Sequence, residues 1–121
     1  MMTTTYAVLL PGDEKTWVDA SAEERSRVYA RHGEFARLLE ERGHTMTGGA
    51  ELAHSSQAKV LRGTLDQVSV TDGPYAETVE QLTGFYLVQT DDLDDLLNLC
   101  GLLSDGEPIE VRACVDPSTQ T

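Results

Sequence analysis

The fold is decided by residues 68–89, which read VSVTDGPYAETVEQLTGFYLVQ. Val68 and Val70 alternate with polar residues, which is the period of a half-buried strand. Asp72-Gly73-Pro74 ends that strand, because glycine allows unusual backbone angles and proline lacks an amide donor. Residues 85–88 form a dense aromatic and aliphatic run that predicts a central strand. The stretch therefore predicts two strands, with the Asp72 carboxylate at the end of the first.

The segments on either side alternate between strand and helix patterns. Residues 6–10 predict a first, central strand, and residues 13–20 predict a loop that contains Trp17. Ser21 and Glu24 have the spacing of a capping box, so a helix of about 20 residues is predicted from there to Gly43. The other predicted elements are a kinked strand at 45–52, a polar loop at 53–58, a hairpin with arms at 59–62 and 67–71, a helix capped by Thr90 that buries Leu93, Leu96, Leu97, Cys100 and Leu103, and a strand at 109–115.

This order of elements predicts an α+β protein with a ferredoxin-like sandwich. Two helices cover one face of an antiparallel sheet, and the hairpin is an insertion. The other face of the sheet needs a cover, and a second copy of the chain is the simplest one, which predicts an isologous homodimer. We expect a single domain over residues 1–116 and a flexible tail over residues 117–121.

Composition limits the classes of function. Twenty-one acidic residues against nine basic ones give a net charge of −12, a field that disfavours nucleic acid. The first residues contain no basic segment and no long apolar run, so we expect no signal peptide, no membrane span and a cytoplasmic protein. The three histidines match no zinc pattern, and no phosphate loop or dinucleotide motif is present. We therefore expect neither a metal nor a cofactor.

His32 and Asp72 are the candidates for acid–base chemistry. His32 falls on the apolar face of the predicted helix, four residues after Val28 and three before Phe35. A nearby carboxylate fixes the tautomer of an imidazole and favours its charged form. Periodicity alone favours a core histidine, and an Asp before Gly-Pro commonly bonds its own turn.

Three further residues near the turn have two readings each. Tyr75 either shapes a pocket wall or simply packs. Glu77 and Glu80 lie three residues apart, and they share one face if residues 76–82 are helical. On that face they bind a cation, act as a second acid or remain solvated, and solvation is the commonest case.

The sequence resembles the DGPF domain, a branch of the YCII-related family. The resemblance covers nearly the whole domain. The segments that carry it are Val70–Thr78, Glu80–Leu82, Gly84–Val88, the helical His32-Gly33-Glu34-Phe35, the strand at residues 6–10 and Val111-Arg112.

The resemblance implies a ferredoxin-like fold of the dimeric α+β barrel class, with a His–Asp active site in a cleft. This site transfers onto His32 and Asp72, with Tyr75, Phe35, Glu77 and Glu80 as candidates for substrate binding. Tyr75 stands where the family has Phe, Thr83-Gly84 replaces its usual Gly-Gly pair, and the hairpin tip at 63–67 is atypical.

Two functions follow as hypotheses. The first is an enzyme for an unknown small molecule, in which His32 and Asp72 support an elimination, an isomerisation or a hydrolysis. The alternative is a non-catalytic metabolite-binding or regulatory module. The acidic surface and the resemblance favour association with a sigma factor in that case, because DGPF members are often encoded beside sigma factors of the extracytoplasmic-function type.

Overall fold

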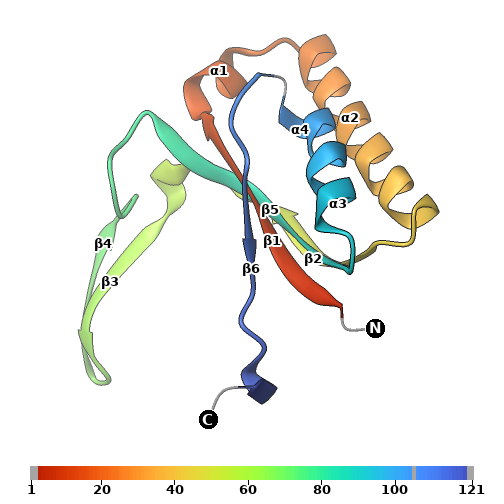
Figure 1. Cartoon of the computed structure of the whole chain (residues 1–121). Helices are drawn as coiled ribbons and strands as arrows, with labels where there is room; N and C mark the ends of the chain where they lie inside the picture. Colours follow the sequence, from red (N-terminus) through yellow and green to blue (C-terminus); the bar gives the residue numbers. More distant parts are fainter. Residues whose placement is uncertain (1–2, 105, 120–121) are drawn as a thin grey trace.

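Strands and helices alternate along the chain, and the computed structural model describes residues 3–104 and 106–119 (Figure 1). The elements are β1 (Thr4–Asp13), α1 (Glu14–Asp19), α2 (Ala22–Glu41), β2 (Thr45–Glu51), the 3-10 turn η1 (Ser55–Gln57), β3 (Lys59–Thr64), β4 (Gln67–Asp72), β5 (Glu80–Thr90), α3 (Leu93–Leu99), α4 (Gly101–Ser104), β6 (Glu110–Ala113) and the 3-10 turn η2 (Pro117–Thr119).

Four strands form an antiparallel sheet in the order β2-β5-β1-β6. The predicted central positions of β1 and β5 are confirmed. Helices α2, α3 and α4 lie on one face of this sheet (Figure 1). With the β3–β4 hairpin and the short α1 and α4 set aside, the order is strand, helix, strand, strand, helix, strand, which is the ferredoxin-like arrangement. The predicted α+β class is confirmed.

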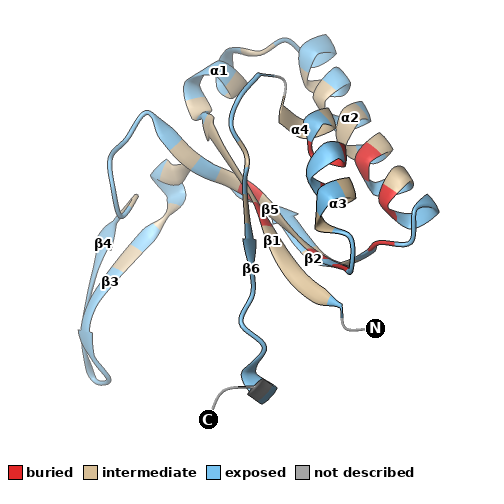
Figure 2. Ribbon diagram, viewed as in Figure 1, coloured by how far each residue is buried: buried red, intermediate tan, exposed pale blue. Residues whose placement is uncertain are grey.

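The core lies between the helices and the sheet, where the buried residues gather in Figure 2. Val8, Phe35, Val88 and Leu96 are each 0% exposed. The buried residues of the strands alternate with less buried ones, as expected of a sheet with one covered face. The predicted stripe of the last helix was wrong at one position: Leu97 is exposed and Leu99 is buried instead. Leu99 follows the buried Leu96 by three residues and shares its face of α3, whereas Leu97, two residues before Leu99, lies on the other side of the helix.

Both ends of α2 follow the sequence signals, and the preceding segment does not. The hydroxyl of Ser21 accepts the amide of Glu24 at 3.0 Å, and Gly43 beyond the C-terminus has a positive φ of 85°. The loop predicted at 13–20 was wrong, because residues 14–19 form α1. The Asp13 carboxylate caps this helix by accepting the amide of Lys15 at 2.9 Å. Likewise, the cap of α3 is Asp92 rather than Thr90.

Strand β2 is kinked, as predicted, by a bulge between Met46 and Gly48. Beyond the bulge, Gly49 has a φ of +150° and lies against β5. A Cβ atom at Gly49 would lie 2.7 Å from the carbonyl oxygen of Phe85 and 2.8 Å from the ring of Tyr86. Glycine is therefore required here, and its lack of a side chain lets the Tyr86 ring lie beside β2.

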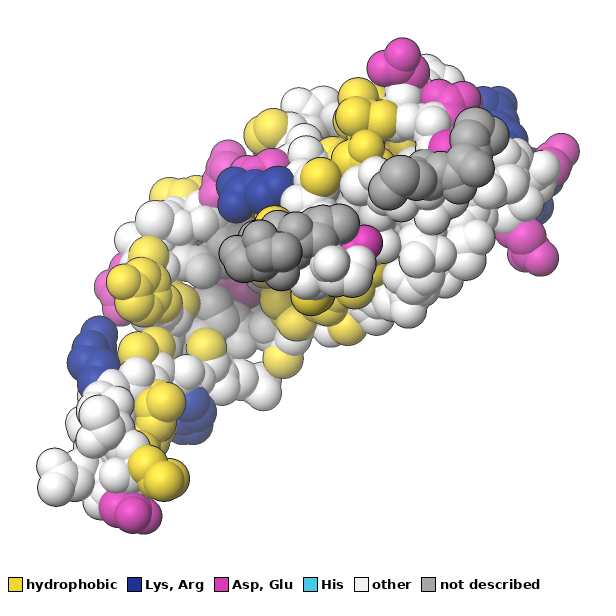
Figure 3. All heavy atoms as spheres, turned by 60° about the horizontal axis from the view of Figure 1, so that its bottom comes forward, with side chains coloured by type: hydrophobic (Ala, Val, Ile, Leu, Met, Phe, Trp, Pro, Cys, Tyr) yellow, Lys and Arg dark blue, Asp and Glu magenta, His cyan; other side chains and the backbone are white. Residues whose placement is uncertain are grey.

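The predicted hairpin is confirmed, but β3 and β4 form a separate two-stranded sheet. Figure 1 shows this hairpin standing apart from the helices, and Figure 3 shows hydrophobic side chains along the narrow arm that it forms. The peptide bond between Gly73 and Pro74, just after β4, is cis. Residues 76–82 are not helical, because β5 begins at Glu80, which pairs with Asp13 of β1.

Candidate functional site

A cleft of about 980 Å³ lies between α1, the first half of α2 and the neighbouring ends of β1, β2 and β5. This volume is at the upper end of the range for small-molecule sites. Five of the polar or aromatic residues that line it contact one another in two groups. They are Trp17, Tyr29, His32, Glu51 and Tyr86.

The imidazole of His32 projects from α2 towards the sheet, as the helical spacing predicted. Its Nδ1 atom lies 2.7 Å from the hydroxyl oxygen of Tyr86 on β5. Within the described part of the chain, its other ring nitrogen, Nε2, has no hydrogen-bond partner. The Tyr86 ring also packs against Phe35, with ring centroids 5.4 Å apart. The core thus fixes Tyr86, and Tyr86 orients a half-buried histidine at the cleft.

The surroundings of His32 and Tyr86 keep both rings neutral near pH 7. Partial burial lowers the pKa of His32 below its ordinary value of 6.5; the charge of Arg31 lowers it further, and Glu51 opposes the shift. Burial and the charge of Glu51 raise the pKa of Tyr86 above 10.0. A neutral imidazole can accept a proton, and a neutral phenol can remain its hydrogen-bond partner.

Glu51 ends β2 at the rim of the cleft. The hydroxyl of Tyr29 lies 3.0 Å and 3.2 Å from its two carboxylate oxygens, and this contact raises the pKa of Tyr29. The Tyr29 ring meets Trp17 of α1 edge-to-face, with centroids 5.5 Å apart. A carboxylate and two aromatic rings therefore form one continuous side of the cleft.

Polar contacts at both ends of α1 hold this helix against the cleft. The guanidinium group of Arg25 donates to the carbonyl oxygens of Trp17 and Val18, at 3.0 Å each. At the other end, the Glu14 carboxylate accepts from the backbone amide of Ser55 at 2.7 Å and also from its hydroxyl. These bonds lower the pKa of Glu14 and connect α1 to the loop after β2.

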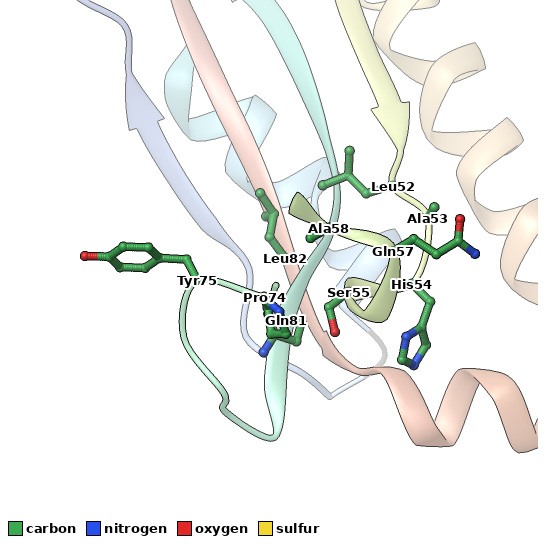
Figure 4. Close-up of a pocket in the computed structure, with 10 residues that line it drawn as sticks. All are labelled: Leu52, Ala53, His54, Ser55, Gln57, Ala58, Pro74, Tyr75, Gln81 and Leu82. Carbon is green, nitrogen blue, oxygen red and sulfur yellow. The ribbon is translucent and has the colours of Figure 1, made fainter. Parts of the chain in front are cut away.

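A second, smaller hollow of about 340 Å³ lies between η1 and the loop after β4 (Figure 4). His54, Ser55, Pro74 and Gln81 are among its lining residues. The aromatic ring of Tyr75 is directed away from the hollow in Figure 4, and Tyr75 is 85% exposed. Neither His32 nor Asp72 lines this hollow.

The structure does not bring the two residues predicted for catalysis together within one chain. His32 lines the large cleft, and Asp72 is absent from its lining. Asp72 is instead exposed at the end of β4, where its carboxylate accepts from the Lys59 ammonium group across the hairpin. The expected hollow shared by His32 and Asp72 is therefore not present in the single chain.

The residues predicted to bind substrate are also dispersed. Phe35 is buried in the core and does not line the cleft. Glu77 and Glu80 are exposed and line neither hollow. Tyr75 lies at the edge of the smaller hollow.

Sequence reasoning missed Tyr86, Glu51 and Tyr29. Tyr86 was placed correctly in a central strand, but its contact with His32 joins residues 54 positions apart. The alternation of β5 carried a usable signal, because Tyr86 and the buried Val88 have the same parity and so share the helix-covered face. No comparable pattern marks Glu51, because strand β2 contains two glycines and a bulge.

A buried histidine also lies outside the cleft. His44, which is 5% exposed, donates from Nε2 to the Asp95 carboxylate at 2.8 Å, while its Nδ1 lies 2.7 Å from the hydroxyl of Thr90. The bond from His44, together with Arg42, lowers the pKa of Asp95. Thr90 also accepts the backbone amide of Asp92 at 2.9 Å, so this network joins the start of β2 to the start of α3. All its members have partners, which is typical of a structural network.

The described residues contain neither a metal-binding cluster nor a membrane-spanning helix. No group of three or more His, Cys, Asp or Glu side chains in residues 3–104 and 106–119 is placed to hold a metal ion. Over the same ranges, the helices lack the length and apolar character needed to cross a bilayer.

Comparison with known proteins gives a family and no activity. The family model described as the YCII-related domain matches residues 4–101. An uncharacterised protein of Rhizobium meliloti (strain 1021) is 38% identical over 103 residues, which cover 85% of this chain and 82% of the relative. The matched region includes β1 to α3 and every residue of the His32 site. The chain therefore belongs to the family of YCII-related domains.

Proposed function

We propose that the chain is a small-molecule enzyme in which His32 transfers a proton inside the large cleft. The observation that carries this proposal is the half-buried imidazole, oriented at 2.7 Å by Tyr86 and lining a cleft of about 980 Å³. A titratable group with a perturbed pKa in a cleft is the usual mark of an active site. His32 is the residue that the sequence predicted, but its hydrogen-bond partner within the chain is Tyr86 instead of Asp72.

The chemistry follows from the two ring nitrogens. In the tautomer that carries its proton on Nδ1, His32 donates to the Tyr86 oxygen and offers the lone pair of Nε2 to a substrate. After Nε2 accepts a proton, the imidazolium keeps the same bond to Tyr86 and can return the proton to another substrate atom. Such a group contributes typically 10²–10⁴-fold to a rate. Elimination, isomerisation and hydrolysis all use this step.

The role proposed for Asp72 depends on a second chain, because Lys59 holds its carboxylate within one chain. We propose that two copies associate through the uncovered face of the four-stranded sheet, as in a dimeric α+β barrel, and that Asp72 takes part in the chemistry only if this association brings its hairpin to the partner's cleft. The support for this dimer is that the uncovered face has apolar residues. Phe85 and Leu87 alternate with the helix-facing Tyr86 and therefore point to the uncovered face.

Light scattering tests the dimer, and two variants locate it. We expect Leu87→Arg to give a monomer, because it puts a charge on the uncovered face. The control Leu97→Arg changes an exposed leucine of α3 and should leave the dimer intact. A wild-type monomer at micromolar concentration would refute this part of the proposal.

Enzyme activity is tested by incubating the protein with a small-molecule extract and following the extract by mass spectrometry. We expect conversions that the wild type performs and His32→Gln does not. The matched control is His54→Gln, which changes another cleft histidine that does not contact Tyr86. If metabolites bind and no conversion depends on His32, the enzyme proposal fails, and the alternative of a metabolite-binding module is favoured.

A further inference from the structure

The charges in the cleft are unequal. Five carboxylates line it, from Asp13, Glu14, Glu24, Glu51 and Glu107, against two guanidinium groups, from Arg27 and Arg31. The Arg27 group is also engaged by Glu23, at 3.2 Å. A cleft whose lining has an excess of one charge attracts ligands of the opposite sign. This excess alone does not locate a ligand.

The position of Glu51 indicates where in the cleft a cationic ligand binds. Its negative charge opposes the lowering of the His32 pKa and raises the pKa of Tyr86, so its field reaches both rings of the proposed catalytic pair. Glu51 lies two residues beyond Gly49, which pairs with Tyr86 across the sheet, so its side chain leaves β2 on the face that carries the Tyr86 ring. Because His32 bonds to Tyr86 on that face, a group bound to Glu51 lies on the same side of the cleft as the imidazole.

The neighbouring rings suit a cation as well. The rings of Tyr29 and Trp17 continue the wall from Glu51, and both line the cleft. The Arg25 guanidinium group lies 5.3 Å from the Trp17 ring centroid but does not line the cleft, so the cation already held by this ring is outside the cleft lining. Aromatic faces attract ammonium groups within about 6 Å, and a carboxylate next to them adds a direct ion pair.

We infer that the cleft binds small molecules that carry an ammonium group, held by the Glu51 carboxylate against the rings of Tyr29 and Trp17. This inference rests on the proposed function in one respect, because the bound molecule is a substrate only if the chain is an enzyme. Glu51 is then the residue that determines specificity, and His32 receives or returns a proton on an atom near the ammonium group. Anionic molecules of the same size are repelled.

Three probes of one shape and different charge test the inference: cyclohexylmethylamine, cyclohexylmethanol and cyclohexanecarboxylate. Trp17 is the single tryptophan of the chain and lines the cleft, so its fluorescence reports binding. At pH 7 we expect the amine to bind at least about tenfold more tightly than the alcohol, because a partly desolvated ion pair supplies that difference. The carboxylate should bind most weakly.

Variants assign the preference to one side chain. In Glu51→Gln the preference for the amine should fall below about twofold. Glu40→Gln, which removes one exposed charge of α2 outside the cleft, should keep the wild-type preference. Tyr29→Phe keeps the Glu51 carboxylate and should also keep the preference, which gives a second measurement if Glu51→Gln does not fold. Tighter binding of the alcohol or carboxylate, or an amine preference unchanged in Glu51→Gln, would overturn the inference.

The failure of this inference differs from that of the proposed function. His32→Gln should still bind the amine selectively while losing every conversion. Selective binding without any His32-dependent conversion would leave the ammonium site standing and remove the enzyme proposal. A His32-dependent conversion of an anionic molecule would do the reverse.

Discussion

Replacing Tyr86 with Phe tests the central contact of the site, because the change deletes one oxygen atom. The ring stays, so its packing on Phe35 at 5.4 Å is retained. The deleted hydroxyl lies 2.7 Å from Nδ1 of His32. The comparison therefore isolates one hydrogen bond in a half-buried position.

The expected loss follows from the degree of burial. A typical hydrogen bond contributes about 0.5–1.5 kcal/mol, and a fully buried unsatisfied group costs about 1–3 kcal/mol. His32 borders an open cleft, so water can replace part of the bond, and we expect a loss of about 1 kcal/mol. For a chain of this size, that loss lowers the melting temperature by roughly 3–6 °C. The pKa of His32 should also fall further, because its imidazolium form loses an acceptor.

Denaturant unfolding measures the first quantity, and NMR titration of the ring nitrogens measures the second. The control is Tyr29→Phe, which deletes a hydroxyl of the same cleft that bonds Glu51 instead of His32. Tyr29 is 51% exposed, so we expect a loss below about 0.5 kcal/mol. Equal losses in the two variants, or a rise in the His32 pKa of Tyr86→Phe, would refute the proposed role of Tyr86.

Three other predictions concern the whole fold. Because the pKa of His32 in the folded state is lowered from 6.5, the unfolded chain binds more protons than the folded chain below that pH. The free energy of unfolding should therefore be highest above about pH 6.5 and decline as the pH falls. Urea titrations should show a smaller decline in His32→Gln. His44→Ala breaks two side-chain bonds of a buried residue and should cost about 2–3 kcal/mol of unfolding free energy, whereas His54→Ala should cost less than about 0.5 kcal/mol; similar costs would contradict the structural role of His44. Gly49→Ala should cost about 1–3 kcal/mol and shift the NMR signals of Tyr86, because the added Cβ would meet Phe85 and Tyr86, and unchanged spectra would argue against that close approach.

The main elements of the fold could be predicted because each buries one face. Strand β5 and helix α2 have apolar residues at the periods of a strand and a helix, and α2 also has a clear cap at Ser21. Helix α1 could not be predicted because six residues are too few to establish a period. The detachment of the hairpin was also beyond the sequence, because alternation shows that a strand has an apolar face and does not show what covers it.

Of the residues in the candidate site, only His32 could be predicted from the sequence. Helical spacing placed His32 on the inner face of α2, and the contact with Tyr86 confirms that placement. The identity of its partner depends on how α2 sits over β5, which is set by the packing of Phe35 and by the space at Gly49. Asp72 is a candidate partner because of its position at a strand end and because of the family resemblance. Its local pairing with Lys59 across the hairpin has no signature in the sequence beyond their opposite charges.

At the base of the hairpin, the amide of Gly73 donates to the carbonyl oxygen of Ala58 at 2.7 Å. The two chain positions that flank the hairpin are thus neighbours in space. The hairpin between Ala58 and Gly73 can therefore be removed, lengthened or exchanged without moving the four-stranded sheet. If it is removed, a tight turn is long enough to join the two positions. We regard this point as the graft site of the domain, because β3 and β4 form a sheet of their own and a change there leaves the pairing of the other four strands intact.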